Sequence, residues 1–127
     1  MLGAAFLVGL FVKILLATLI IRELAKISGK WLKKYVEEKL RNREKHKVAF
    51  IRTKDVIMSD EFRREIANSR EVSMDELERM DEKSPYIAAV LDENDEIEEY
   101  EGFKASEYNE NFEARMKQMN GIIVVEG

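Results

Sequence analysis

Residues Leu2–Ile21, LGAAFLVGLFVKILLATLII, decide which fold class the sequence predicts. Lys13 is the only charged residue of this stretch, and thirteen of its twenty residues are Leu, Ile, Phe or Val. As a helix the stretch would span about 30 Å, which matches the hydrocarbon core of a bilayer. The apolar side chains outweigh the roughly 2.5 to 3.5 kcal/mol that one lysine costs at membrane depth. We therefore expect a transmembrane helix over residues 1–21.

Two alternatives to this span are a cleaved secretory signal and a helix buried in a globular domain. A secretory signal has a basic region before a shorter apolar core and a small-x-small cleavage site after it. No basic residue precedes this core, and Ala17-Thr18-Leu19 is a poor cleavage site. The transmembrane helix is thus favoured over both alternatives.

The basic residues that flank the predicted span all follow it. Lysine and arginine near a membrane span stay on the cytoplasmic side. The residues concerned are Arg22, Lys26, Lys30, Lys33 and Lys34. The sequence therefore predicts a single-pass membrane protein with its N-terminus outside and its C-terminal domain cytoplasmic.

Small residues recur every four positions in the predicted span and share one helix face with its lysine. Ala5, Gly9, Lys13 and Ala17 form this face. Such stripes let transmembrane helices approach closely, and an ionisable group at membrane depth is by default a functional candidate. We expect these four residues to form a membrane helix interface, either with a protein partner or through self-association.

Residues 22–47 carry ten Lys or Arg against four Glu, and their apolar residues recur every three or four positions. This spacing predicts a basic amphipathic helix that continues from the span. Aromatic rings favour the headgroup layer, and lysines attract anionic lipid. The predicted membrane-surface contacts are Lys26, Lys30, Trp31, Lys33, Lys34 and Tyr35. A solvated linker helix and a nucleic-acid site are the alternatives, and the acidic remainder of the chain argues against nucleic acid.

Residues 48–127 have a net charge of −11 and predict a small domain of sheet and helices. Ser73 and Glu76 fit a capping box, Ser59 fits a helix cap, and Gly121 fits a helix stop. Alternation and caps predict strands at 48–51, 86–91, 97–103 and 122–125, and helices at 60–68, 74–82 and from about 107. The last strand, apolar throughout, is predicted to be central. The predicted fold class is therefore α+β, joined to the membrane helix by the basic helix.

Residues that carry catalytic or metal chemistry are scarce. The chain has no cysteine, and its one histidine, His46, lies in a basic run that fits a solvated helix end. The acidic stretch that begins at Asp92 fails the calcium-loop template, because Ile97 stands where glycine is required and Phe103 where glutamate is required. No phosphate loop or nucleophile motif occurs, so we predict no enzyme activity, no cofactor and no metal.

These observations together predict a non-catalytic interaction or regulatory module that is anchored to the lipid bilayer and binds a protein partner or a second copy. The alternative is a homo-oligomeric channel or lysis-type pore built on the Ala5, Gly9, Lys13 and Ala17 face.

Overall fold

The sheet is built around two strands, β2 (Lys47–Arg52) and β3 (Tyr86–Leu91), whose apolar side chains are buried on both faces. The computed structural model describes residues 3–17 and 19–126. The remaining elements are α1 (Ala4–Leu16), β1 (Ile21–Ile27), α2 (Gly29–Leu40), α3 (Thr53–Ile57), α4 (Asp60–Ala67), α5 (Met74–Lys83), β4 (Ile97–Tyr108), α6 (Glu110–Gln118) and β5 (Ile122–Glu126).

The five strands form one mixed sheet in the order β1-β4-β3-β2-β5. Across residues 3–17 and 19–126, only the β1–β4 pair is parallel, and the other three pairs are antiparallel. β4 is long enough to serve two neighbours, because its first half pairs with β3 and its second half with β1. β1 and β5 are therefore the two edges of the sheet.

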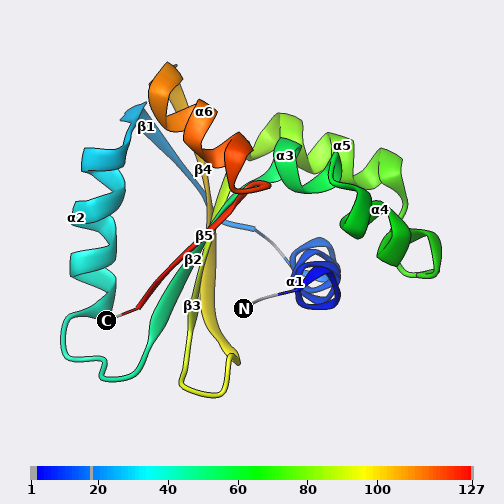
Figure 1. The fold of residues 1–127 in the computed structure, drawn as a ribbon, viewed down its shortest axis with the longest axis horizontal. Helices are drawn as coiled ribbons and strands as arrows, with labels where there is room; N and C mark the ends of the chain where they lie inside the picture. The colour runs from blue at the N-terminus through cyan, green and yellow to red at the C-terminus, as the bar shows by residue number, and fades with distance from the viewer. Residues whose placement is uncertain (1–2, 18, 127) are drawn as a thin grey trace.

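Helices cover both faces of the sheet, as Figure 1 shows with the sheet seen edge-on. Val48 and Phe50 of β2 point to one face, where they pack with residues of α2 and α6. Ala49 and Ile51 point to the other face, where they pack with residues of α1, α3, α4 and α5. Strands with apolar residues at successive positions need such a cover on both sides.

The predicted transmembrane helix is wrong. Within residues 3–17 and 19–126, no helix combines the length and apolarity needed to cross a membrane. α1 has 13 residues, or about 20 Å of helix, and the chain is extended again at Ala17. Leu10, Phe11 and Ile14 are buried against the protein, and Phe11 meets Phe62 of α4 edge-on with ring centroids 5.4 Å apart.

The predicted orientation, N-terminus outside and the rest cytoplasmic, fails with the span on which it depended. The helix expected to continue from the span is also wrong at its start, because Arg22 to Ile27 form a strand. This strand pairs with β4, and the amide of Gly102 donates to the carbonyl of Ile20 at 2.9 Å just before it. The α+β class itself is confirmed.

Local signals in the second half of the chain placed most elements correctly. The Ser73 capping box is present, with both reciprocal hydrogen bonds, and Ser59 caps α4 by accepting from the amide of Phe62. β3 begins and ends at the predicted residues. Several other bounds differ by one residue. The larger differences are that α3 was not predicted, β4 extends to Tyr108, α6 begins at Glu110, and β5 lies at an edge.

We expect Gly102→Ala to lower the free energy of unfolding by about 2 to 3 kcal/mol. Gly102 lies between β1 and β3, and an added Cβ would collide with the hydroxyl of buried Ser84. That hydroxyl donates to the carbonyl of Tyr86 at 2.7 Å, so moving it breaks a buried hydrogen bond. Urea denaturation monitored by circular dichroism measures the loss.

Gly9→Ala is the matched control. Gly9 is exposed in α1, and nothing lies within 4 Å of the added Cβ. Because alanine is the better helix former, this variant should gain about 0.5 to 1 kcal/mol. If both variants changed stability by the same amount and in the same direction, the account of packing at Gly102 would be refuted.

Candidate interaction site

The two edge strands of the sheet differ in how their open sides are protected. β1 carries charged residues, and two of them form ion pairs with β4: Arg22 with Glu101 at 3.1 Å and Lys26 with Glu107 at 3.6 Å. Charges of this kind, lysine above all, discourage pairing with another strand. β5 has the sequence IIVVE, with no lysine, arginine or proline. Of the two edges, β5 is therefore the one open to an added strand.

A tight turn sets β5 at this edge. Asn120 and Gly121 have positive φ angles of 55° and 84°, and the amide of Gly121 donates to the carbonyl of Met116 at 2.8 Å. β5 then pairs antiparallel with β2, from Ile122 opposite Ile51 to Glu126 opposite Lys47. In the part of the chain that the structure describes, β2 is the only strand beside β5.

An apolar groove of about 440 Å³ runs beside β5 on the face of the sheet that α2 and α6 cover. It is lined mainly by apolar side chains, namely Leu32, Val36 and Leu40 of α2, Phe112 of α6, and Ile123 and Val125 of β5. The three α2 residues recur every four positions and so form one helix face. The groove thus extends the apolar surface that Ile123 and Val125 form on this face of the sheet.

Charged residues also line this groove. α2 and β5 both run from the top to the bottom of Figure 1, and α6 lies at the top. Lys33 and Glu37 of α2, Arg115 of α6 and Glu126 of β5 are among the residues that line it. Strand alternation puts the side chain of Glu126 on the face of Val124, where it lies opposite Lys47 of β2. Charged residues of both signs therefore border the apolar groove.

Exposed apolar residues lie on the other face of the same edge. Val124 of β5 is 39% exposed, Met119 just before it is 51% exposed, and Met58 after α3 is 59% exposed. Met58 and Met119 line a second hollow together with Ile122 of β5. Exposed apolar residues gathered in one place mark interaction sites more often than the same residues scattered singly.

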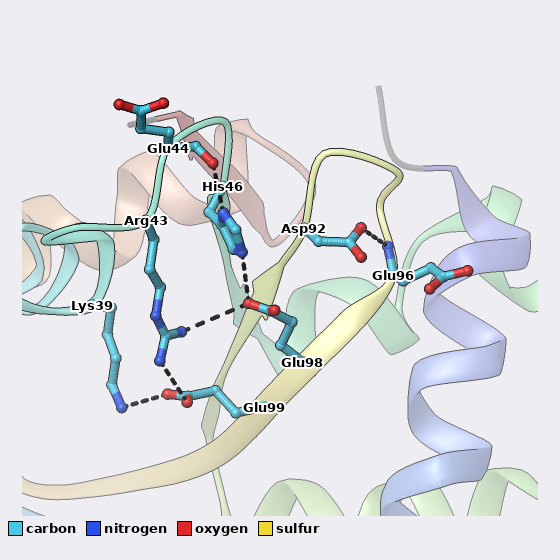
Figure 2. A network of polar contacts seen from close by, with 8 residues as sticks. All are labelled: Lys39, Arg43, Glu44, His46, Asp92, Glu96, Glu98 and Glu99. Carbon is cyan, nitrogen blue, oxygen red and sulfur yellow. Dashed lines mark hydrogen bonds and ion pairs between the residues drawn. The ribbon is translucent and has the colours of Figure 1, made fainter.

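The polar clusters away from β5 hold helices and strands of the fold together. Lys39 and Arg43 reach Glu99 on β4 at 2.5 and 3.3 Å, and His46 Nε2 lies 2.8 Å from a carboxylate oxygen of Glu98 (Figure 2). Hydrogen bonds from Lys39 and Arg43 hold the pKa of Glu99 below its usual value. His46 Nδ1 also lies 2.7 Å from the carbonyl of Glu44. His46 is half-buried and lies beyond the end of α2, just before β2, so the prediction of a solvated histidine at a helix end is wrong. This cluster ties the end of α2 to β4.

A second cluster ties α3 and α6 to the end of β2. Arg52 pairs with Asp55 at 2.9 Å and with Glu113 at 3.2 Å, and the hydroxyl of Tyr86 donates to Glu113 at 3.4 Å. Burial raises the pKa of Tyr86, and it also raises the pKa of Asp81 on α5. Among the described residues, no three potential ligands gather to hold a metal ion.

The residues predicted to form a membrane helix interface, Ala5, Gly9, Lys13 and Ala17, lie on the exposed side of α1 and at its end. The first three line a hollow with Asp95, Glu96 and Ile97 of the β3–β4 hairpin. Among the predicted membrane-surface residues, Lys26, Lys30, Lys33 and Lys34 are exposed, Trp31 is half-buried and Tyr35 is buried. The two rings stack with centroids 5.2 Å apart and both contact Phe103 in the core.

Sequence reasoning missed the β5 edge and found only parts of its surroundings. It recognised the apolar residues of β5 and took them for a central strand. It also recognised the helical spacing of Leu32, Val36 and Leu40, and assigned them to a membrane-surface helix. Whether an apolar strand lies at the middle or the edge depends on pairing with distant residues. A charged residue within an edge strand discourages pairing with another strand, and none lies between Ile122 and Val125. This was the one local signal in the sequence that β5 could accept an added strand.

We expect Glu99→Gln to lower the free energy of unfolding at pH 7 by about 0.5 to 1 kcal/mol, because the carboxylate joins two cations. A lowered pKa stabilises the folded state above the usual carboxyl pKa of 4.5, and this contribution disappears as the pH falls through the lowered value. The difference between wild type and variant should therefore vanish in acid. Urea denaturation at several pH values measures it, with exposed Glu78→Gln of α5 as the control. A pH-independent loss would contradict this role of Glu99.

No family model, curated protein or solved structure matches the chain in the three comparisons made. Function is therefore inferred from the residues around β5 and from their exposure.

Proposed function

We propose that this chain is a non-catalytic protein-interaction module that binds an extended polypeptide segment as an added strand along β5. The observation that carries the proposal is the open edge of β5, whose residues 122–125 are apolar and include no charge that would discourage pairing with another strand. It has an apolar groove on one face and exposed Val124 and Met119 on the other. An edge of this kind is a template for pairing with another chain.

The recognition mode follows from strand geometry. Main-chain hydrogen bonds to β5 supply the affinity, and they are independent of the side chains of the bound segment. Successive side chains of that segment point to opposite faces of the sheet. Every second one enters the groove beside Ile123 and Val125, and the others lie beside Val124. The module therefore prefers segments with apolar residues at alternating positions.

The two membrane hypotheses drawn from the sequence, an anchored module and a pore, are not retained. Both the membrane-anchored module and the pore depend on a transmembrane helix, and the described residues contain no helix fit for that role. The module is proposed to be non-catalytic because its clustered charged groups form ion pairs with one another. Arg52 is held by Asp55 and Glu113, and Glu99 is held by Lys39 and Arg43.

A display library of random nine-residue peptides tests the proposal without knowledge of the natural partner. Selection against the full chain, immobilised at low density, should enrich extended peptides with alternating apolar residues. Hydrogen exchange with a selected peptide should protect the amides of residues 122–126. Val124→Lys places a gatekeeping lysine on the edge and should weaken binding at least about tenfold, a change near 1.4 kcal/mol.

The matched control is Leu16→Lys. Leu16 is an apolar residue at the end of α1 that is 85% exposed, away from β5. Binding to this variant should stay within about twofold of wild type, since exposed substitutions away from the site have small effects. Selected peptides that bind Val124→Lys as tightly as wild type, or that protect amides elsewhere, would refute a binding site at β5.

A further inference from the structure

We infer that Met58 and Met119 form a site of reversible methionine oxidation, and that a peroxide which oxidises them weakens the binding of a segment along β5. The placement and the exposure of the two residues carry the first part of this inference. The second part rests on the proposed function, because it names how binding at the same edge is regulated.

The two methionines come from distant parts of the chain and meet beside the start of β5. Met58 follows α3, and Met119 follows α6. The turn after α6 packs against α3, since a Cβ added at Gly121 would lie only 2.8 Å from the amide nitrogen of Val56. Figure 1 shows the end of α6 and the start of β5 beside α3. Met58 and Met119 thereby line one hollow of about 510 Å³ together with Ile122, the first residue of β5.

Exposure separates these two methionines from the others that the structure describes. Met58 is 59% exposed and Met119 is 51% exposed, whereas Met80 is 5% exposed and Met116 is fully buried. Met74 is half-buried and packs against the core. Oxidation requires an oxidant from solvent to reach the sulfur, so the exposed pair reacts first. Within residues 3–17 and 19–126, the exposed methionines therefore both lie at the β5 edge.

The reaction needs a peroxide and no further group from the protein. A lone pair on the methionine sulfur attacks one oxygen of hydrogen peroxide, so that an S–O bond forms as the O–O bond breaks. The transferred oxygen gives its proton to the departing hydroxide, which leaves as water. The sulfur is oxidised by two electrons, and the peroxide is reduced by two. The product, methionine sulfoxide, is polar, and sulfoxide reductases return it to the thioether.

The hollow lies on the face of the sheet opposite the apolar groove. Ile122 packs there with the core residues of α1, α3, α4 and α5, and strand alternation puts Val124 on the same face. Every second side chain of a segment added along β5 points to this face. A sulfoxide oxygen in the hollow holds water, and an apolar side chain that covers it must displace this water at a cost in free energy. Oxidation of Met58 and Met119 therefore weakens binding at β5.

Oxidation at these two positions leaves the core of the protein intact. Met80 and Met116 belong to the two core clusters, one on each face of the sheet, and they keep their thioethers. Met58 and Met119 are both exposed before oxidation, so a polar oxygen on them adds no polar group to the core. The effect of the peroxide is confined to the surface beside β5.

Peptide mapping by mass spectrometry, applied to the full chain during treatment with hydrogen peroxide, locates the oxidation. Met58 and Met119 should each gain one oxygen atom at least about tenfold faster than Met80 and Met116. The map reports each methionine separately, so the reaction of Met1, which lies outside the described residues, is measured alongside. Equal rates at the exposed and the buried methionines would contradict the assigned site.

Affinity for a peptide selected against the untreated chain, itself free of methionine and tryptophan, tests the regulation. After the chain has been treated with peroxide and the peroxide removed, the dissociation constant should rise at least about tenfold. Sulfoxide reductases for both epimers should restore it. Circular dichroism should show an unchanged fold throughout.

The variant Met58→Leu/Met119→Leu is the control for oxidation at other residues. Leucine keeps an apolar side chain of similar size without the sulfur, and the variant retains Trp31 and the other methionines. Whatever its own affinity for the peptide, peroxide should change its dissociation constant by less than about twofold. Met74→Leu removes a sulfur away from β5, and its affinity should fall on oxidation as that of wild type does.

The outcomes separate this inference from the proposed function. Peptides that protect residues 122–126 and bind the oxidised chain as tightly as the untreated chain overturn the regulation alone. An equal loss of affinity in wild type and in Met58→Leu/Met119→Leu also overturns it, because the loss then comes from other residues. If no peptide binds at β5, the proposed function and its regulation both fall, and the peptide map still decides whether Met58 and Met119 are the oxidation site.

Discussion

The rest of the structure depends on covering the two central strands on both faces. β2 and β3 bring four successive buried apolar positions or more to the sheet, so each face needs its own layer of helices. On one face α2 and α6 suffice. On the other, the helices α3, α4 and α5 follow one another between β2 and β3, and α1 completes the layer through Phe11 and Ile14. The apolar residues of α1 are thus used inside the protein.

This use of α1 explains the main error of the sequence-based prediction. Hydropathy records that a segment prefers apolar surroundings, and it does not record whether lipid or protein supplies them. Residues 21–27 were misjudged for a related reason. Ile21, Leu24 and Ile27 are spaced three apart, which is helical periodicity, yet pairing with β4 makes the segment a strand. β4 lies far along the chain, so the sequence of residues 21–27 does not reveal that they pair with it.

The sequence was sufficient to predict those helix ends and turns that depend on interactions between residues close together in the chain. Serine caps at Ser59 and Ser73 and the left-handed glycine at Gly121 act within a few residues, and they fixed the start or end of three helices. The strands predicted at 86–91 and 97–103 leave the acidic residues 92–96 as their connection, and Asp92 accepts there from the amides of Asn94 and Glu96. The candidate site could be predicted only in part, because β5 and α2 are identifiable as apolar elements but their adjacency depends on the whole sheet order.

The parallel pairing of β1 with β4 delays the folding of β1 while the chain is being synthesised. Arg22 and its partner Glu101 are 79 residues apart, so β1 has no strand to pair with until β4 has been made. At usual rates of translation this delay is about 4 to 16 s. Meanwhile the apolar residues of α1 have left the ribosome ahead of the sheet that will bury them. Chaperones that bind nascent apolar segments would therefore meet this chain through its first helix, well before the rest of the domain exists.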